Sequence, residues 1–151
     1  RHIIELTEKE LARHHRRPSN LTFMLMDIDH FKQINDQFGH DMGDRALVAV
    51  SKALQGALRE QDVICRWGGE EFLVILPDTD LEQATASAER LRSAIESLEL
   101  EQDGERVSVT LSIGITQYRA EELLSSAVAR ADHALYAGKS AGRNRVEIAL
   151  A

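Results

Sequence analysis

The sequence lacks most of the features that indicate disulfide bonds, disordered linkers or insertion in a membrane. Its only cysteine is Cys65, so no disulfide can form within the chain, as suits a reducing cytosol. It has two prolines and no low-complexity tract, so long disordered linkers are not expected. No apolar run approaches the roughly 20 residues of a membrane-spanning helix, and no signal peptide is visible. We therefore expect a cytoplasmic segment without membrane contact, although other regions of a longer protein could be anchored.

Basic residues are also in the minority. The chain has 18 lysines and arginines against 25 aspartates and glutamates, which gives a net charge of −7. This balance argues against binding to a nucleic-acid polymer, which usually requires a basic face. A nucleotide site is not excluded, because one phosphate pocket needs only a few local cations. The 151 residues fit one domain, residues 1–151, and the abrupt helix-like start (RHIIELTEKELARHHRR) predicts a fragment cut from a longer protein.

Apolar periodicity predicts a chain in which helices and strands alternate. Helices are expected over residues 2–16, 30–38, 41–59, 81–98 and 121–137. Strands are expected over residues 21–28, 62–67, 70–76, 107–118 and 146–148. The second and third strands flank two glycines and should form a hairpin within the core sheet. This order predicts an α/β fold (an α+β sandwich) with a mixed, largely antiparallel central sheet flanked by helices.

Acidic residues follow two of the predicted strands. Asp27 and Asp29 end the apolar run LTFMLMDI, and Glu70 and Glu71 follow the glycine pair. A carboxylate at the end of a buried strand is costly unless it is paired or holds a cation, and Mg²⁺ prefers such oxygen ligands together with substrate phosphates. If the first strand lies beside the hairpin, Asp27 meets one of the glutamates. Neighbours on a strand face opposite sides, so both glutamates should not face Asp27 unless the turn distorts the backbone. The residues alone do not choose between the two glutamates.

Each of these carboxylates has a plainer interpretation. Asp29 could be the N-cap of the following helix, an interpretation at least as good as metal binding. Glu70 and Glu71 could be solvated turn residues. Asp27 is the hardest to explain in this way, because it ends a run that should be buried.

Two stretches could bind phosphate. The backbone N–H groups of His30, Phe31 and Lys32 open a predicted helix and would be free to bind an anion. Lys139 and Arg143 lie four residues apart around a predicted helix end and could clamp a polyphosphate. The alternative is that these two cations only stabilise the end of the helix dipole.

An amide and a carboxylate could recognise a base. Asn35 and Asp44 together suit guanine, because a carboxylate can accept hydrogen bonds from the ring N–H and the exocyclic amine. Asp44 is equally a good residue for the first turn of a helix.

Together these stretches resemble the GGDEF domain of diguanylate cyclases over nearly the whole chain. The matching stretches are DIDHFKQIND (27–36), FGHDMGD (38–44), RWGGEEF (66–72), SIGIT (112–116) and ADHALYAGKSAGRNRV (131–146). The resemblance implies a sheet fold related to the palms of nucleotidyl cyclases and polymerases. It also implies condensation of two GTP molecules into cyclic di-GMP, with release of two pyrophosphates. Each domain would hold one GTP, so a catalytic homodimer is implied.

The resemblance also implies roles for the acidic residues. Asp27, the backbone carbonyl of Ile28 and Glu70 would hold Mg²⁺ (or Mn²⁺). Glu71 would be a second metal ligand or would help to deprotonate the 3′-hydroxyl. The third motif position is Glu here instead of Asp, and both forms occur in active members of the family.

The implied substrate contacts come from three parts of the chain. Guanine would be recognised by Asn35 and Asp44, with His40 near the sugar or base. The phosphates would be held by the amides of Phe31 and Lys32 and by Lys139 and Arg143.

The segment REQD before the hairpin matches the family's RxxD site for inhibition by the product, cyclic di-GMP. Arg59 and Asp62 would form this site, and Arg90 on the next predicted helix would add a secondary contact. Taken alone, the segment could equally be a solvated helix end. One departure is that the chain begins just after the usual D-x-L-T-G-L-x-N-R stretch, so the resemblance implies a fragment that lacks this first motif and the N-terminal regulatory region that usually precedes it. This departure leaves a catalytically weak or inactive sensor of cyclic di-GMP or GTP as the alternative function.

Overall fold

The structure, a computed structural model, describes Lys9 and residues 20–149 of the chain. The helix predicted over residues 2–16 lies outside these residues except for Lys9. The described helices are α2 (Phe31–Phe38), α3 (His40–Ala57), α4 (Leu81–Glu96) and α5 (Leu124–Ser140). The described strands are β1 (Leu21–Ile28), β2 (Val63–Arg66), β3 (Glu71–Pro77), β4 (Leu100–Gln102), β5 (Glu105–Val107), β6 (Leu111–Gln117) and β7 (Arg145–Ala149).

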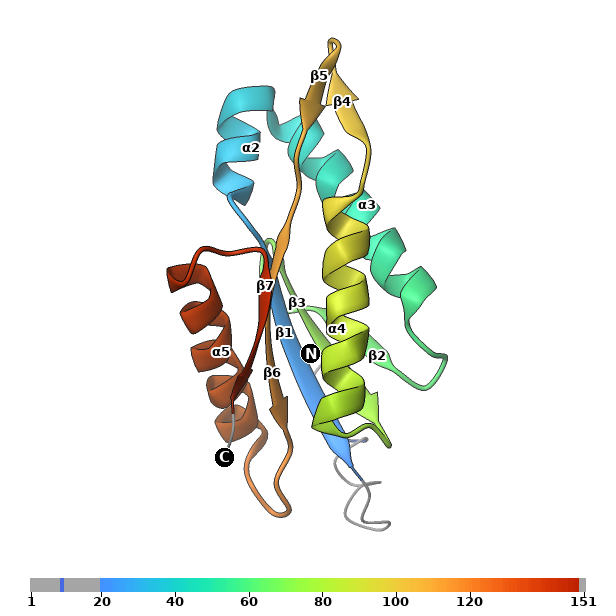
Figure 1. The fold of residues 1–151 in the computed structure, drawn as a ribbon, viewed down its shortest axis with the longest axis vertical. Helices are drawn as coiled ribbons and strands as arrows, with labels where there is room; N and C mark the ends of the chain where they lie inside the picture. Colours follow the sequence, from blue (N-terminus) through green and yellow to red (C-terminus); the bar gives the residue numbers. More distant parts are fainter. Residues whose placement is uncertain (1–8, 10–19, 150–151) are drawn as a thin grey trace.

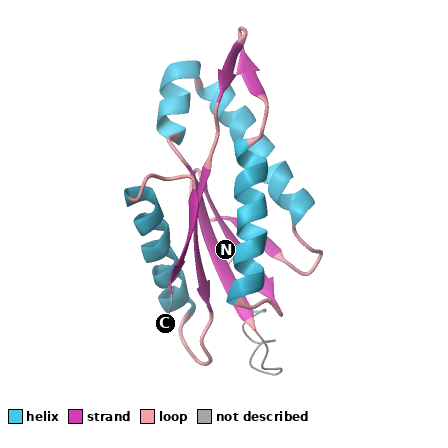
Figure 2. Cartoon of the chain, viewed as in Figure 1, coloured by secondary structure: helices cyan, strands magenta, loops and turns pink. Residues whose placement is uncertain are grey.

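A five-stranded sheet in the order β2-β3-β1-β6-β7 forms the centre of the described domain. Figure 2 shows this sheet with helices beside it. Neighbouring strands are antiparallel except for β6 and β7, which are parallel. The sheet lies between α5 on one face and α3 and α4 on the other (Figure 1). The predicted mixed, largely antiparallel sheet with helices on its faces is therefore confirmed.

The alternation of β1 builds both faces of the core. Met24, Met26 and Ile28 pack toward α3 and α4, whereas Phe23 and Leu25 pack toward α5. All eight residues of β1 are buried, because helices cover both sides of this central strand. The apolar run that predicted a buried strand therefore has the predicted bounds.

Helix α5 approaches the sheet closely at Gly114 on β6. A Cβ at this position would overlap the carbonyl oxygen of Ala131 and the backbone nitrogen of Leu135. Only glycine lets the helix backbone lie directly on the strand. This contact sets the distance between α5 and the sheet.

The strand predicted over residues 107–118 is two elements instead of one. Val107 belongs to β5, which pairs with β4 in a separate two-stranded hairpin, and β6 begins at Leu111. The turn between β4 and β5 is Asp103-Gly104, and both residues have positive φ values, 52° and 81°. An Asp-Gly pair is a strong hairpin signal, but apolar periodicity does not detect it.

None of the helices in the described part of the chain combines the length and the apolar character needed to cross a membrane.

Candidate active site

The end of β1 brings the predicted acidic residues together. In the sheet register Asp27 lies opposite Glu71 of β3 on one side and Ser112 of β6 on the other. The backbone N–H of Ile28 donates to the carbonyl of Glu70 at 3.2 Å. The first strand therefore lies beside the hairpin, which is the condition for Asp27 to meet a hairpin glutamate.

Asp27 is a buried carboxylate with an incomplete set of partners. Its side chain is 9% exposed, and Oδ2 accepts a hydrogen bond from the ammonium group of Lys139. Oδ1 is buried and has no hydrogen-bond partner within the described residues. Burial raises the pKa of Asp27, Lys139 opposes this rise, and the charges of Glu70 and Asp29 add to it. A second positive charge at Oδ1 would satisfy the free oxygen and stabilise the ionised form.

The two glutamates of the hairpin line different hollows. Glu70 lines a cavity of about 280 Å³ at the end of β1, together with Asp27 and Ile28. Glu71 lines a hollow on the α5 side of the sheet, beside Trp67 and Asp132.

The pKa of Glu71 is raised. Burial is the main cause, and the charge of Asp27 across the strands is the next. Glu71 is therefore a stronger base than an exposed glutamate.

The first turn of α2 opens onto the same cavity as Glu70. Phe31 and Lys32 line it, and the first hydrogen bond of the helix runs from the N–H of Ile34 to the carbonyl of His30, at 3.1 Å. The amides of Phe31 and Lys32 precede that bond, so the helix itself provides no acceptor for them. The N-cap, His30, makes no side-chain capping bond. These amides are available to an anion in the cavity.

Lys139 and Arg143 also reach this cavity, from the far side of the sheet. Lys139 lies in the last turn of α5, and Arg143 lies in the turn that leads into β7. The structure thus gathers into one cavity the four residues predicted to bind phosphate, with two backbone amides on one side and two cations on the other.

Asp29 does not act as the helix N-cap, so that interpretation was wrong. Its buried carboxylate instead accepts hydrogen bonds from the hydroxyls of Thr110 and Ser112, both at 2.7 Å, and from the backbone N–H of Asn144 at 2.9 Å. The backbone at His30 has a φ of 55°, which turns the chain so that Asp29 points away from the start of α2. Sequence analysis missed this role because the partners are distant in sequence.

The residues predicted to recognise a base lie along α2 and α3. Asn35 is half-buried, and its Oδ1 lies against the Cα of Gly43, where any Cβ would collide with it. Asp44 follows on α3 and is exposed, and it lines a shallow hollow beside Val48. His40 is the exposed first residue of α3. Asn35 therefore lies between the two helices, whereas Asp44 and His40 are open to solvent.

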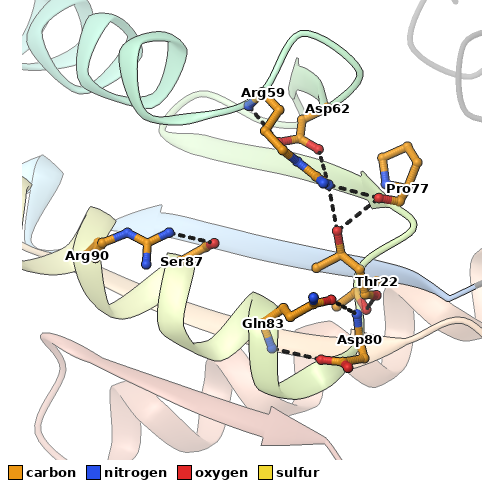
Figure 3. A network of polar contacts seen from close by, with 9 residues as sticks. Thr22, Arg59, Asp62, Pro77, Asp80, Gln83, Ser87 and Arg90 are labelled. Atoms are coloured by element: carbon orange, nitrogen blue, oxygen red, sulfur yellow. Dashed lines mark hydrogen bonds and ion pairs between the residues drawn. The ribbon is translucent and has the colours of Figure 1, made fainter.

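A second cavity, of about 330 Å³, gathers the three predicted inhibitory-site residues, Arg59, Asp62 and Arg90. The guanidinium of Arg59 contacts the carboxylate of Asp62 at 3.0 Å, and it also donates to the carbonyl of Pro77 and the hydroxyl of Thr79 (Figure 3). Arg90 on α4 donates only to Ser87 among the described contacts, at 3.2 Å. This cavity shares no lining residue with the cavity at Asp27.

The carboxylates at the end of β1 fit a metal that the substrate completes. Within residues 20–149 no group of three or more His, Cys, Asp or Glu side chains could hold a metal ion alone. Mg²⁺ commonly uses one or two carboxylates and takes its remaining ligands from water and substrate phosphates. The free Oδ1 of Asp27, in one cavity with Glu70 and the first residues of α2, matches that pattern.

Comparison with known proteins identifies the family. The sequence profile described as "Diguanylate cyclase, GGDEF domain" matches residues 1–145. The diguanylate cyclase DgcP of Pseudomonas aeruginosa is 47% identical over 147 residues, which are 97% of this chain but 22% of that protein. The chain spans about a fifth to a third of the first curated relatives it matches.

Solved structures agree with this match. The GGDEF domain of DgcB from Caulobacter crescentus, in complex with c-di-GMP, superposes with a TM-score of 0.92 at 30% identity, covering 97% of this chain and 88% of that one. The active GGEEF domain of a diguanylate cyclase from Vibrio cholerae superposes with a TM-score of 0.88 at 33% identity, covering 95% of this chain and 91% of that one. The chain belongs to the GGDEF domain family.

Proposed function

We propose that this domain is a diguanylate cyclase module that condenses two GTP molecules into cyclic di-GMP and releases two pyrophosphates. The observation that carries the proposal is the buried Oδ1 of Asp27, which has no hydrogen-bond partner among the described residues. Asp27 lines a cavity that is also lined by two basic side chains and by the first residues of α2, whose amides are free. An anionic substrate with its cation would satisfy both halves of that cavity. The relatives named diguanylate cyclase support the same reaction.

The phosphates of GTP would lie between the two sides of the cavity. The amides of Phe31 and Lys32 would donate to them from the start of α2, where the helix dipole favours negative charge. Lys139 and Arg143 would bind them from the opposite side. Lys139 now contacts Asp27, so a metal at that carboxylate would free the ammonium for the phosphates.

Asp27, the carbonyl of Ile28 and Glu70 would hold Mg²⁺, or Mn²⁺ in its place. When bound, the metal would neutralise phosphate charge and lower the pKa of the attacking hydroxyl. Asn35 and Asp44 would bind the guanine, and His40 would lie near the sugar or base. These contacts would fix the α-phosphate for attack.

In each half-reaction the 3′-oxygen of one GTP forms a bond to the α-phosphorus of the other. The bond from that phosphorus to the bridging oxygen breaks, and pyrophosphate leaves with the electron pair. One domain holds one GTP, so two copies must face each other, and the active species would be a homodimer. Glu71, a strengthened base beside Asp27, would take the hydroxyl proton or act as a further metal ligand.

The second cavity would bind cyclic di-GMP as an inhibitor. Arginine pairs with phosphate and with guanine edges, and aspartate accepts from guanine N–H groups, which suits Arg59, Asp62 and Arg90. The same cavity is the observation that favours the alternative function, a sensor that binds cyclic di-GMP without turnover.

Turnover separates these two functions. The full-length protein is incubated with GTP and Mg²⁺, and the products are identified by mass spectrometry. We expect cyclic di-GMP and pyrophosphate in a 1:2 ratio. Binding of cyclic di-GMP without any cyclic dinucleotide formed from GTP would reject the enzyme and support the sensor.

Glu70→Gln tests the metal site. It removes one carboxylate charge and should lower turnover by at least roughly a hundredfold without loss of folding. Glu101→Gln, an exposed change on the distant β4, is the matched control and should leave turnover unchanged. Wild-type turnover in Glu70→Gln would remove Glu70 from the mechanism.

Arg90→Ala and Arg59→Ala test the inhibitory cavity by calorimetry with cyclic di-GMP. Loss of hydrogen bonds to a charged ligand predicts affinity about tenfold weaker or more for each variant. Arg106→Ala, at an exposed position of β5, is the control. Equal affinity in the Arg59 and Arg90 variants would place the inhibitor elsewhere.

A further inference from the structure

The turn between α5 and β7 has an unusual backbone. Gly142, Arg143 and Asn144 follow one another with φ values of 124°, 64° and 48°. Positive φ is easy for glycine and costly for arginine, while asparagine tolerates it better. Strained residues of this kind persist only where surrounding contacts hold them. Arg143, which the proposed function assigns to phosphate binding, lies at the centre of this strained turn.

The backbone of the turn is tied to the end of β1. The N–H of Asn144 donates to Oδ2 of Asp29 at 2.9 Å, and the N–H of Arg143 donates to the carbonyl of Gly138 at 2.9 Å. Asp29 is itself fixed by the hydroxyls of Thr110 and Ser112 and is 4% exposed. Asp29 also lies two residues beyond Asp27. The hydrogen bond to Asp29 therefore holds the turn next to the end of β1, which carries the candidate metal ligand.

The side chain of Asn144 makes a second attachment, to α4. Its Oδ1 accepts from Nη1 of Arg92 at 2.9 Å, and its Nδ2 donates to Oε2 of Glu96 at 2.5 Å. Arg92 is in turn paired with Glu89 and Glu96 along the same helix. Asn144 thus uses its main chain to bind the sheet and both ends of its amide to bind α4.

These contacts do not involve the side chains of Lys139 or Arg143. They fix the backbone from which the Arg143 side chain extends. We propose that Asn144, fixed by Asp29 and by Arg92 with Glu96, is a positioning residue that holds the Arg143 side chain at the nucleotide phosphates. This inference rests on the proposed function, because it assumes that Arg143 binds phosphate. It assigns Asp29 a supporting role in place of a metal-ligand role.

Two substitutions at one position separate the backbone from the side chain. Asn144→Gly keeps the left-handed conformation accessible but removes both bonds to α4, whereas Asn144→Ala removes the bonds and also disfavours the conformation. The probe is a GTP analogue with a methylene group between the α- and β-phosphates, with Mg²⁺, titrated into the full-length protein by calorimetry. We expect affinity about threefold weaker for Asn144→Gly and about tenfold weaker for Asn144→Ala, since one charge-assisted contact is misplaced.

A double-mutant cycle then tests whether Asn144 acts through Arg143. Arg143→Ala alone should weaken binding by at least about tenfold. Adding Asn144→Ala to Arg143→Ala should change affinity by less than about twofold, because the contact to be positioned is already gone. A merely structural role would give effects that multiply, and that result would overturn the inference.

Asp103→Ala is the matched control for backbone strain. Asp103 has a φ of 52° in the distant β4–β5 turn, so this variant removes a similar residue without touching the cavity. It should bind the analogue as the wild type does. Weaker binding in this control, equal to that of Asn144→Ala, would mean that general destabilisation explains the effect and would overturn the inference.

The two proposals fail in different ways. If Arg143→Ala binds the analogue as tightly as the wild type does, the phosphate role of Arg143 is wrong and this inference falls with it. If Arg143→Ala binds weakly while both Asn144 variants bind normally, only the positioning role of Asn144 is wrong.

Discussion

Replacing Gly43 with alanine should damage nucleotide recognition without destabilising the fold. Gly43 is buried in the first turns of α3, and a Cβ there would overlap Oδ1 of Asn35 and crowd the ring of Phe31. The backbone of Gly43 does not have positive φ, so alanine is compatible with the helix. The only demanding adjustment is that the short side chain of Asn35 must turn away from α3.

The two consequences of Gly43→Ala have opposite signs. Alanine in place of glycine inside a helix contributes up to about 1 kcal/mol, which offsets much of the cost of moving Asn35. The free energy of unfolding should therefore stay within about 1 kcal/mol of the wild-type value. If Asn35 binds the base as proposed, moving its amide should remove one hydrogen bond, about 0.5–1.5 kcal/mol, or roughly a twofold to tenfold loss of affinity.

Gly56→Ala in the same helix is the matched control. An added Cβ at Gly56 meets nothing within 4 Å, so this variant gains helix propensity alone. It should unfold up to about 4 °C higher and bind nucleotide unchanged. Calorimetry with non-hydrolysable GTP and ATP analogues gives the affinities, and thermal unfolding gives the stabilities. Gly43→Ala with wild-type affinity and an unchanged preference for guanine would refute the role of Asn35.

Three further predictions concern packing and charge. Gly114→Ala should destabilise the domain by about 1–3 kcal/mol or more in denaturant unfolding, because its Cβ would overlap the backbone of Ala131. Arg130→Met should lower the free energy of unfolding by about 3–5 kcal/mol, because the carboxylate of Glu122, 2.8 Å away and 13% exposed, loses its charge partner. Adding Glu122→Gln should recover part of that loss. Burial opposes ionisation of Glu122, but hydrogen bonds led by Arg130 lower its pKa below 4.5. The stabilisation from this ion pair is therefore full above about pH 4.5 and is lost as acid protonates Glu122 in the folded protein. The free energy of unfolding, measured across that pH range, should depend less on acid in Arg130→Met than in the wild type. Burial raises the pKa of Cys65, so a thiol reagent at neutral pH should react with it far more slowly than in the unfolded chain.

Elements with strong apolar periodicity could be predicted closely, and their ends less so. The run Leu21–Ile28 is buried on both faces and was predicted with the correct bounds. Helix α5 begins at Leu124, three residues later than the predicted start at residue 121. The reason is a turn in which the backbone N–H of Arg119 donates to the carboxylate of Glu122, while Glu121 has a φ of 65°. Such local side-chain bonds compete with a helix and leave no periodic signal.

The candidate site was predictable where residue type alone limits the chemistry. Asp27 stood out because a carboxylate ending an apolar run requires a partner. Asp29 and Asn144 could not be assigned, because their bond joins residues 115 positions apart and depends on a left-handed turn. Residue types show which side chains carry positive or negative charge. They do not show which polar side chains bind the protein backbone and which are available to a ligand.

The hairpin turn resolves how both glutamates can lie near Asp27 despite strand alternation. Strand β3 begins at Glu71, and the N–H of Trp67 closes the turn on the carbonyl of Glu71 at 2.9 Å. Glu70 therefore lies in the turn and is free of the pleat that governs Glu71. The guanidinium of Arg66 donates to the carbonyl of Gly69 at 2.5 Å and stacks 5.5 Å from the centre of the Phe72 ring. The turn is thus held by a side chain that does not line the cavity at Asp27, and its carboxylates are divided between the two hollows. Glu70 lies with Lys139 and Arg143, and Glu71 lies opposite Asp27 in the sheet register.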